Sequence, residues 1–251
     1  MSKKKNTKKK NHAPIKTREQ LMAEKKSAEA ATKKKTVIIT SIVLAVIVGL
    51  IIMTVCLTLS GRDPGLKVNG EAKDTVYVKM TVKDYGDIIL KLDGKEAPIT
   101  VKNFVTLVNQ GFYNGLTFHR VMNDFMIQAG DPNADGSGGS ANKITGEFEE
   151  NGYHNCIAHG RGVISMARRS NDNNSASSQF FICNATNENV SHLDGSYAAF
   201  GYVISGMDVV DLITTKTAML GDSNGVIGEK DKQAVISSME VISAREAKKY
   251  S

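Results

Sequence analysis

The sequence predicts a mainly β domain: a closed or nearly closed antiparallel barrel with two α-helices, preceded by a single transmembrane helix. Three observations lead to this fold class. Residues 37–59 form an uncharged run rich in Val, Ile and Leu. Most of the later chain consists of short apolar segments of strand length between loops rich in Gly, Asn and Asp. Only two segments have helical spacing of apolar residues, and many short strands with few helices favour a barrel.

The N-terminal part of the chain differs in composition from the rest. Residues 1–35 contain 13 Lys and Arg against three Glu, a net charge of +10; the whole chain is +6, so residues 36–251 carry −4. The 23 uncharged residues at 37–59 are long enough to cross a hydrocarbon core of roughly 30 Å. We therefore expect a lysine-rich, disordered tail (1–35), a membrane anchor (36–60), a linker (61–74), a folded domain (75–245) and a short C-terminal tail (246–251).

The charge distribution also predicts the orientation of the anchor. Lysines flank the N-terminal side of the apolar run, so the positive-inside rule places the N-terminus in the cytoplasm and the domain outside the membrane. This single-pass topology suits the plasma membrane of a bacterium with one membrane. A cleaved signal peptide is the main alternative, but its apolar region is ordinarily about 7–15 residues long. We expect residues 37–59 and the lysine tail to contact membrane lipids rather than nucleic acid, and we expect a monomer.

The folded domain can be divided into elements in order. Residues 75–92 alternate in polarity around a KDYG turn, which predicts a hairpin. The next segment has Pro98 near its start and Gly111 at its end, which predicts a helix between them. MDVVDLITT at 207–215 predicts a second helix. The remaining strand candidates are LTFHRV (116–121), FMIQAG (125–130), GVISMA (162–167), QFFICN (179–184), AAFGYVIS (198–205) and AVISSMEVI (234–242).

Several familiar chemical motifs have little support. The loop GDPNADGSGGS at 130–140 is glycine-rich but lacks the Gly-Lys-Ser/Thr ending of a phosphate-binding loop. His154, Cys156 and His159 do not have the spacing of a zinc finger, so a structural role is favoured over a metal site. His119 has aspartates nearby, but no serine lies in a nucleophile-elbow sequence. A hydrolase on a β-barrel therefore rests only on scattered Ser, His and Asp.

FHRVMNDFMIQAG at 118–130 is the most informative stretch, because it places Arg120 among apolar residues with no obvious carboxylate partner. Burying an unpaired guanidinium is costly. Alternation puts Met126 and Gln128 on one strand face and Gln179 and Phe181 on another. If Phe118 and Arg120 share a third face beside them, the three segments form an apolar pocket with a guanidinium and two amides at its edge.

Four segments, FHRVMNDFMIQAGDP, GVISMARR, NNSASSQFFIC and HLDGSYAAFG, occur in an order that resembles the cyclophilin family of peptidyl-prolyl cis–trans isomerases. The likeness runs from about residue 75 to about 244 and implies an eight-stranded antiparallel barrel capped by two helices. It implies catalytic roles for Arg120, Phe125 and Gln128. It implies substrate binding by Met126, Ala167, Arg168, Gln179, Phe181, His192, Leu193 and Tyr197.

Three of these positions depart from the best-known members of the family. His192 stands where they have tryptophan, Tyr197 where they have histidine and Arg168 where they have asparagine. An imidazole offers less contact area than an indole, so we expect weak cyclosporin binding. Arg168 is expected to bind substrate only through its backbone, so loss of its side chain should matter little.

The resemblance predicts an enzyme that accelerates rotation about Xaa-Pro bonds and assists folding outside the membrane. Such a reaction needs no metal and no cofactor, and its partners are polypeptides that contain proline. The alternative from another class is an anchored chaperone or binding module that holds proline-containing segments without significant turnover. The complete set of Arg120, Phe125, Gln128 and Phe181 favours catalysis.

Overall fold

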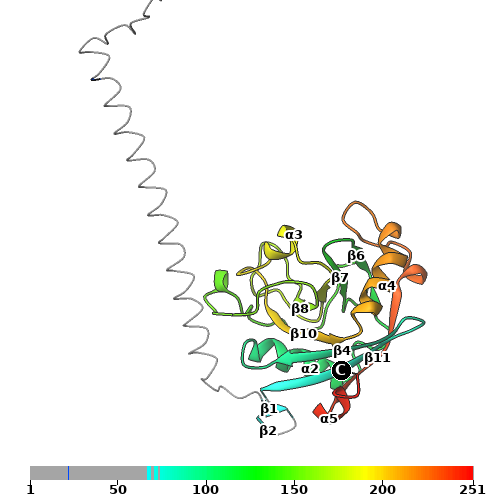
Figure 1. Cartoon of the computed structure of the whole chain (residues 1–251), viewed down its shortest axis with the longest axis horizontal. Helices are drawn as coiled ribbons and strands as arrows, with labels where there is room; N and C mark the ends of the chain where they lie inside the picture. The colour runs from blue at the N-terminus through cyan, green and yellow to red at the C-terminus, as the bar shows by residue number, and fades with distance from the viewer. Residues whose placement is uncertain (1–21, 23–66, 69–70, 73, 251) are drawn as a thin grey trace, which may run out of the picture. The chain divides into compact units, whose positions relative to one another are not determined.

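A computed structural model describes residue 22, residues 67–68 and 71–72, and residues 74–250 (Figure 1). The predicted anchor at 37–59 and nearly all of the lysine-rich tail lie outside the described residues. Among the residues that are described, no helix is both long and apolar enough to cross a bilayer.

Nine antiparallel strands form the main sheet, in the order β5-β11-β3-β4-β10-β8-β9-β7-β6. Their bounds are β3 (Thr75–Val82), β4 (Gly86–Asp93), β5 (Thr117–Phe118), β6 (Arg120–Met122), β7 (Met126–Ala129), β8 (Val163–Met166), β9 (Phe180–Cys183), β10 (Ala199–Ser205) and β11 (Ala234–Ile242). The predicted hairpin and five of the six further strand candidates are thereby confirmed, whereas the candidate at 116–121 is divided between β5 and β6. The predicted linker contains a separate antiparallel pair, β1 (Lys67–Val68) and β2 (Glu71–Ala72).

The sheet curves until its two edge strands are neighbours in the sequence. β5 and β6 lie at opposite ends of the strand order, yet only His119 separates them along the chain. A loop from residues 225–227 lies against this junction: Val121 N–H donates to the Gly225 carbonyl at 2.9 Å, and Ile227 N–H donates to the His119 carbonyl at 2.8 Å. The result is a nearly closed barrel with few unpaired backbone groups at its seam.

The same junction corrects two expectations. The sheet has nine strands rather than eight, because the segment predicted as one strand at 116–121 is interrupted at His119 and contributes to both edges. The interruption also changes the alternation of side chains. Phe118 is fully buried in the main core, whereas Arg120 is half-exposed on the outer surface. The prediction that these two side chains share a face beside the pocket is therefore wrong.

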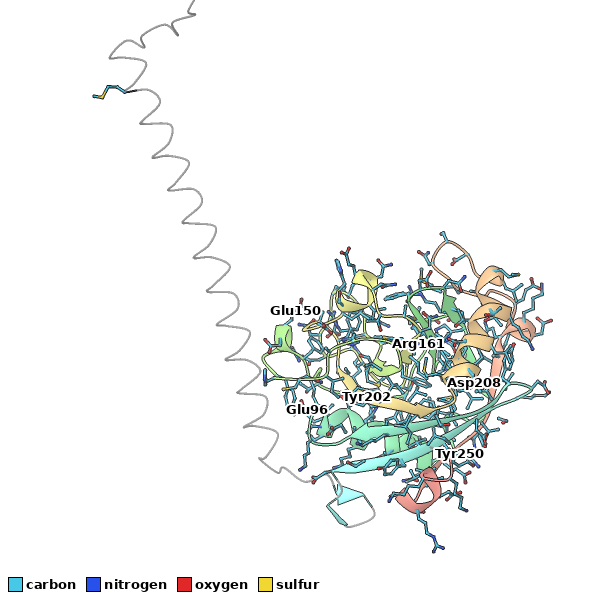
Figure 2. All side chains as sticks on the ribbon, in the orientation of Figure 1. Glu96, Glu150, Arg161, Tyr202, Asp208 and Tyr250 are labelled. Carbon is cyan, nitrogen blue, oxygen red and sulfur yellow. The ribbon has the colours of Figure 1, made fainter. Side chains whose placement is uncertain are left out.

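Two longer helices accompany the barrel, as the sequence predicts: α2 (Pro98–Asn109) and α4 (Met207–Thr217). Shorter helical turns are α3 (Glu188–Ser191), α5 (Ala244–Ala247), η1 (Glu149–Asn151), η2 (Ala218–Leu220) and η3 (Lys230–Lys232). The predicted C-terminal tail is ordered in part, because α5 packs Ala247 against buried Ile89 and Ile242, and Tyr250 adds to this cluster (Figure 2).

The N-terminus of α2 is held by a carboxylate from a distant loop. Glu147 is fully buried and accepts hydrogen bonds from the backbone N–H groups of Ile99 and Thr100, at 2.9 and 2.8 Å. These are two of the donors that the first turn of a helix leaves unpaired. Burial raises the pKa of Glu147 from its ordinary value. The interaction fixes α2 against the loop that precedes η1.

The interior of the barrel is filled by inward-facing apolar side chains from every strand of the sheet. Phe104 from α2 is central, with ring centroids 5.0–5.4 Å from those of Tyr113, Phe180 and Phe200. Such aromatic groups bury large apolar areas and dominate core energetics. Because apolar side chains occupy the interior, the outward-facing side chains of the strands are the ones available for a site.

Candidate active site

A row of outward-facing side chains crosses four neighbouring strands of the barrel. Arg120 on β6 lies directly opposite Gln128 on β7, Gln128 lies opposite Phe181 on β9, and Phe181 lies opposite Ser165 on β8. Residues directly opposite in an antiparallel pair point to the same face of the sheet. Their sequence neighbours Val121, Ile127 and Ile182 point inward to the core. Strand register therefore brings together groups that are up to 61 residues apart in sequence (120 to 181).

Arg120 is held by neutral acceptors. Its Nε donates to the Asn224 carbonyl at 2.8 Å, Nη1 donates to Gln128 Oε1 at 3.1 Å, and Nη2 lies 3.2 Å from Met122 Sδ. Its guanidinium carbon is 5.9 Å from the ring centroid of Phe125. Within the described part of the chain, no carboxylate is within ion-pairing distance. Burial lowers the pKa of Arg120 from its ordinary value, but an arginine this basic stays charged at neutral pH.

A chain of side-chain amides fixes the polar edge of the site. Gln128 accepts from Arg120 and donates through Nε2 to Gln179 Oε1 at 2.8 Å. Gln179 Nε2 in turn donates to the carbonyls of Gly136 and Gly138, at 3.0 and 2.7 Å. Both amides are thereby oriented before any ligand arrives.

An apolar pocket of about 140 Å³ opens next to the guanidinium. Phe125, Met126, Phe181 and Leu193 line it, and the ring of Tyr197 meets the ring of Phe181 edge-on at 5.8 Å. These side chains belong to a cluster that is separate from the main core of the barrel. The pocket is therefore a preformed, half-open apolar site with a fixed cation at its rim, which suits a small apolar ring attached to a polar backbone.

His159 is buried behind the pocket and connects two of its sides. Its Nδ1 is 2.8 Å from Asp194 Oδ1, its Nε2 is 3.0 Å from Ser165 Oγ, and its ring stacks on Phe181 at 6.1 Å. Burial lowers the pKa of His159 from its ordinary value, although Asp194 opposes this effect. The Ser165–His159–Asp194 connectivity resembles a hydrolytic triad, but Ser165 is fully buried and cannot reach a substrate carbonyl. The hydrolase alternative therefore gains no support.

Comparisons with known proteins agree with this architecture. The family described as cyclophilin type peptidyl-prolyl cis-trans isomerase matches residues 77–241. The chain is 43% identical over 174 residues to peptidyl-prolyl cis-trans isomerase A of Dickeya dadantii, covering 68% of this chain and 87% of that relative. It is 43% identical over 151 residues to a peptidyl-prolyl cis-trans isomerase of Acinetobacter baylyi, covering 59% and 77% of the two chains. The chain belongs to the cyclophilin family. It is a peptidyl-prolyl cis–trans isomerase.

Solved structures support the cyclophilin fold independently. A cyclophilin-type peptidyl-prolyl cis-trans isomerase of Cryptosporidium parvum superposes with a TM-score of 0.58 at 26% sequence identity. The superposition covers 67% of this chain and 98% of that one. A second structure, of the same Cryptosporidium protein in the presence of the dipeptide Ala-Pro, gives a TM-score of 0.57 at 27% identity.

The cyclophilin domain brings together most of the residues that the sequence predicts for its site. Nine of them line the apolar pocket, namely Arg120, Phe125, Met126, Gln128, Ala167, Arg168, Phe181, Leu193 and Tyr197. Gln179 lies just outside it and is joined through Gln128. His192 is exposed, does not line the pocket, and has its Nδ1 2.9 Å from the Glu188 carbonyl. Weak cyclosporin binding stays a prediction.

The side chain of Arg168 has structural contacts of its own, while substrate binding through its backbone stays a prediction. Its side chain is only 7% exposed, and Nε donates to the Ser196 carbonyl at 2.8 Å. Nη1 donates to the carbonyls of Arg169 and Ser170, at 3.1 and 3.2 Å. Its guanidinium carbon lies 4.7 Å from the ring centroid of Tyr197 and 5.2 Å from that of Phe148. The side chain therefore clamps the segment that supplies one wall of the pocket.

Sequence reasoning missed the residues that support the site from behind. His159 and Asp194 make no direct contribution to the pocket lining, and Asn224 contributes only a backbone carbonyl. Asp194 adjoins Leu193 in the HLDG motif, so its position was a usable signal, whereas nothing in the sequence marks Asn224. Within the residues that the structure describes, no group of three or more His, Cys, Asp or Glu is arranged to hold a metal ion.

Proposed function

We propose that Arg120 is the principal catalytic group of this isomerase and that the adjacent apolar pocket holds the proline ring of the substrate. The barrier to rotation about a peptide bond comes from amide resonance and is about 18–20 kcal/mol. In the twisted amide, resonance is lost, the proline nitrogen regains a lone pair and can accept a hydrogen bond. A fixed guanidinium beside the ring can supply that bond without a nucleophile or a proton transfer.

The geometry of Arg120 is the observation that carries this proposal. A guanidinium has more N–H groups than the three that contact Asn224, Gln128 and Met122. The remaining donors have no carboxylate to pair with among residues 74–250. The surrounding contacts hold the group in one orientation before substrate binds, so little reorganisation is needed during rotation. Unpaired charge next to an apolar pocket is then explained by a partner that arrives with the substrate.

The substrate class follows from the same pocket. A volume of about 140 Å³ lined by Phe125, Met126, Phe181 and Leu193 suits a pyrrolidine ring. The Cryptosporidium parvum relative whose structure was determined in the presence of Ala-Pro supports proline-containing peptides as ligands. Gln128 lines the pocket beside Arg120, and its side-chain amide offers a polar group for the polypeptide backbone next to the proline.

The test is isomerase activity of Arg120→Ala on a short Xaa-Pro peptide. Loss of one preorganised donor to a developing charge costs about 10²–10³ in rate, so kcat/KM should fall by that amount. Arg120→Lys should rescue poorly, because a point ammonium does not reproduce the planar fork. Arg245→Ala, which removes an exposed arginine on α5, is the matched control and should keep normal activity. A folded Arg120→Ala variant with near-normal kcat/KM would show that the mechanism is wrong.

The same measurements address a binding module that holds proline-containing segments without significant turnover. In that case the unmodified domain would bind such peptides and isomerise them slowly, and Arg120→Ala would change affinity and rate little. The fixed donors of Arg120 favour turnover over simple retention.

We also propose that the isomerase is anchored in a plasma membrane and acts on polypeptides on its outer side. The proposal rests on the uncharged run at 37–59 and on the lysines that precede it. Membrane lipids would then contact this run and the basic tail. Protease added to intact cells should digest or release the isomerase domain while sparing the lysine-rich tail. Full protection of the domain would overturn this orientation.

A further inference from the structure

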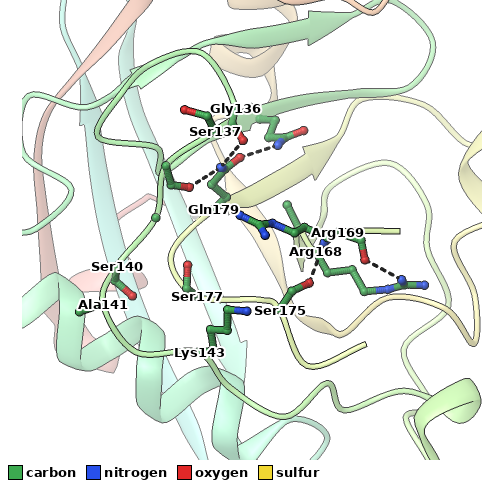
Figure 3. A pocket seen from close by; sticks show the side chains of 14 residues that line it. Gly136, Ser137, Ser140, Ala141, Lys143, Arg168, Arg169, Ser175, Ser177 and Gln179 are labelled. Atoms are coloured by element: carbon green, nitrogen blue, oxygen red, sulfur yellow. Dashed lines mark hydrogen bonds between the residues drawn. The ribbon is translucent and has the colours of Figure 1, made fainter. Parts of the chain in front are cut away.

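A second and larger hollow adjoins the proline pocket (Figure 3). Its volume is about 240 Å³, compared with about 140 Å³ for the apolar pocket. The loop at 136–143 lines one side, and residues 167–169 with Gln179 line another. Gln128, Ala167 and Arg168 line both hollows. A peptide with its proline in the first hollow therefore has flanking residues within reach of the second.

Every charged side chain that lines this second hollow is positive. Lys143, Arg168 and Arg169 line it, and no carboxylate does. The guanidinium of Arg168 is occupied by backbone carbonyls and turns away from the hollow, whereas the side chain of Arg169 extends over it towards Gln179 (Figure 3). Lys143 Nζ is 3.5 Å from Asp172 Oδ2, a long contact between half-exposed side chains. Such exposed pairs are weak, so Lys143 and Arg169 remain able to bind an anion.

The backbone of the loop that lines the hollow packs closely against its neighbours at two glycines. A Cβ atom on Gly138 would collide with Asp131 Oδ1, and one on Gly139 would collide with Ser177 Oγ. Asp131 is itself buried and accepts hydrogen bonds from the backbone N–H groups of Asn133 and Gly136 at 2.8 and 2.6 Å. The loop is therefore held in one shape by its own hydrogen bonds, and a side chain from a ligand can enter.

We propose that the second hollow selects substrates with an acidic residue close to the proline, with the carboxylate placed between Lys143 and Arg169. The proposal rests on the isomerase activity described above and names the class of substrate that the same site prefers. An extended peptide advances about 3.3 Å per residue, and the two hollows share Gln128, Ala167 and Arg168 as lining residues, so the acidic residue is placed within a few positions of the proline. An acidic residue there adds two charge contacts that a neutral peptide lacks.

Long-range electrostatic attraction between the protein and an acidic peptide does not account for a preference that depends on the position of the acidic residue. Residues 36–251 carry a net charge of −4 and the lysine-rich tail carries +10, so any long-range attraction comes from the tail and acts on an acidic residue at every peptide position alike. Screening at physiological ionic strength limits surface electrostatics to roughly 8 Å. A preference that depends on the position of the acidic residue in the peptide must therefore come from cations near the bound substrate.

The experiment measures kcat/KM for a neutral Xaa-Pro host peptide and for versions with Glu, Gln or Lys two or three positions before or after the proline. At one of these positions we expect the order Glu, then Gln, then Lys. Each exposed charge contact is worth up to about five-fold, so Glu should exceed Gln by about two- to ten-fold at low salt. The ratio should shrink in high salt. Equal rates for Glu and Gln at every position would overturn the proposal, as would an equal preference at all positions.

Charge variants of the protein test whether Lys143 and Arg169 cause the preference for peptides that contain Glu. Lys143→Glu with Arg169→Glu should invert the order of the peptides, and Asp172→Asn should strengthen the preference for Glu by releasing Lys143. Lys83→Glu with Lys91→Glu makes the same change in net charge at exposed positions outside the hollow, so the preference should persist. An inverted order in this control would refute the assignment. If the first double variant does not fold, Lys143→Gln and Arg169→Gln replace it, and each should reduce the preference. The neutral host peptide reports the isomerase activity separately, so failure of the two proposals can be distinguished.

Discussion

Removal of the Arg168 side chain tests whether it supports the pocket wall. Arg168→Ala deletes the hydrogen bonds to the carbonyls of Ser196, Arg169 and Ser170 and the stacking on Tyr197 and Phe148. It also leaves a gap where a side chain with only 7% exposure had packed. The substitution also removes the ion pair between Arg168 Nη2 and the Glu150 carboxylate, which are 3.6 Å apart. Because the Glu150 side chain is 58% exposed, losing this ion pair changes the free energy of unfolding little (Figure 2).

The magnitude follows from these contacts. A hydrogen bond from a charged donor contributes about 1.5–3 kcal/mol, and a cation–π contact contributes about 0.5–2 kcal/mol. The contributions are coupled because they belong to one side chain, so they do not add in full. We expect the free energy of unfolding to fall by about 2–4 kcal/mol, which lowers Tm by roughly 4–16 °C for a domain of this size. Because Ser196 and Tyr197 become less ordered, KM should rise more than kcat falls.

The assay is urea unfolding combined with steady-state isomerisation of a neutral Xaa-Pro peptide. Arg245→Ala is the control for loss of an arginine, because Arg245 is exposed on α5 and does not line the pocket. If Arg168→Ala changes the free energy of unfolding by less than about 0.5 kcal/mol, as surface substitutions typically do, and leaves KM unchanged, the Arg168 side chain does not support the pocket wall. The original expectation of a backbone-only role would then be correct.

Two further outcomes follow from the pocket and from the buried imidazoles. Phe125→Ala should lower kcat/KM by about 10- to 100-fold, because burial of an aromatic ring contributes roughly 1.5–3 kcal/mol. The domain should stay folded, because Phe125 lies outside the main core. Normal activity of this variant on an Xaa-Pro peptide would show that Phe125 is not part of the pocket wall. Burial lowers the pKa values of His119 and His159, so the unfolded chain binds protons at a higher pH than the folded chain does. Their contribution to stability is therefore complete above about pH 6.5 and is lost as pH falls below it, by up to about 1.4 kcal/mol per pH unit for each group. Urea unfolding at pH 7.5 and 5.5 should show this decline, and His159→Gln should reduce the slope; an identical slope would contradict the assignment.

Local patterns in the sequence determined the elements and most of the site. The hairpin at 75–92, the helix that begins at Pro98 and the strands β7 to β11 follow from alternation, helical spacing and turn residues, which act over a few positions. The site residues could be named because the motifs around Arg120 and Phe181 resemble those of one family. Nine of the eleven predicted residues line one pocket for this reason.

Only the tertiary structure decided how the edges of the barrel meet and what supports the pocket. The break at His119 sends Phe118 inward and Arg120 outward, which no periodicity in FHRVM predicts, because it depends on pairing with β11 at one end and β7 at the other. The Arg168 clamp and the His159–Asp194 contact join segments 28 and 35 residues apart. The C-terminal turn at α5 is ordered because Ala247 and Tyr250 pack on Ile89, which lies about 160 residues earlier in the chain. Contacts of this range are specified by the folded geometry and leave no regular pattern in the sequence.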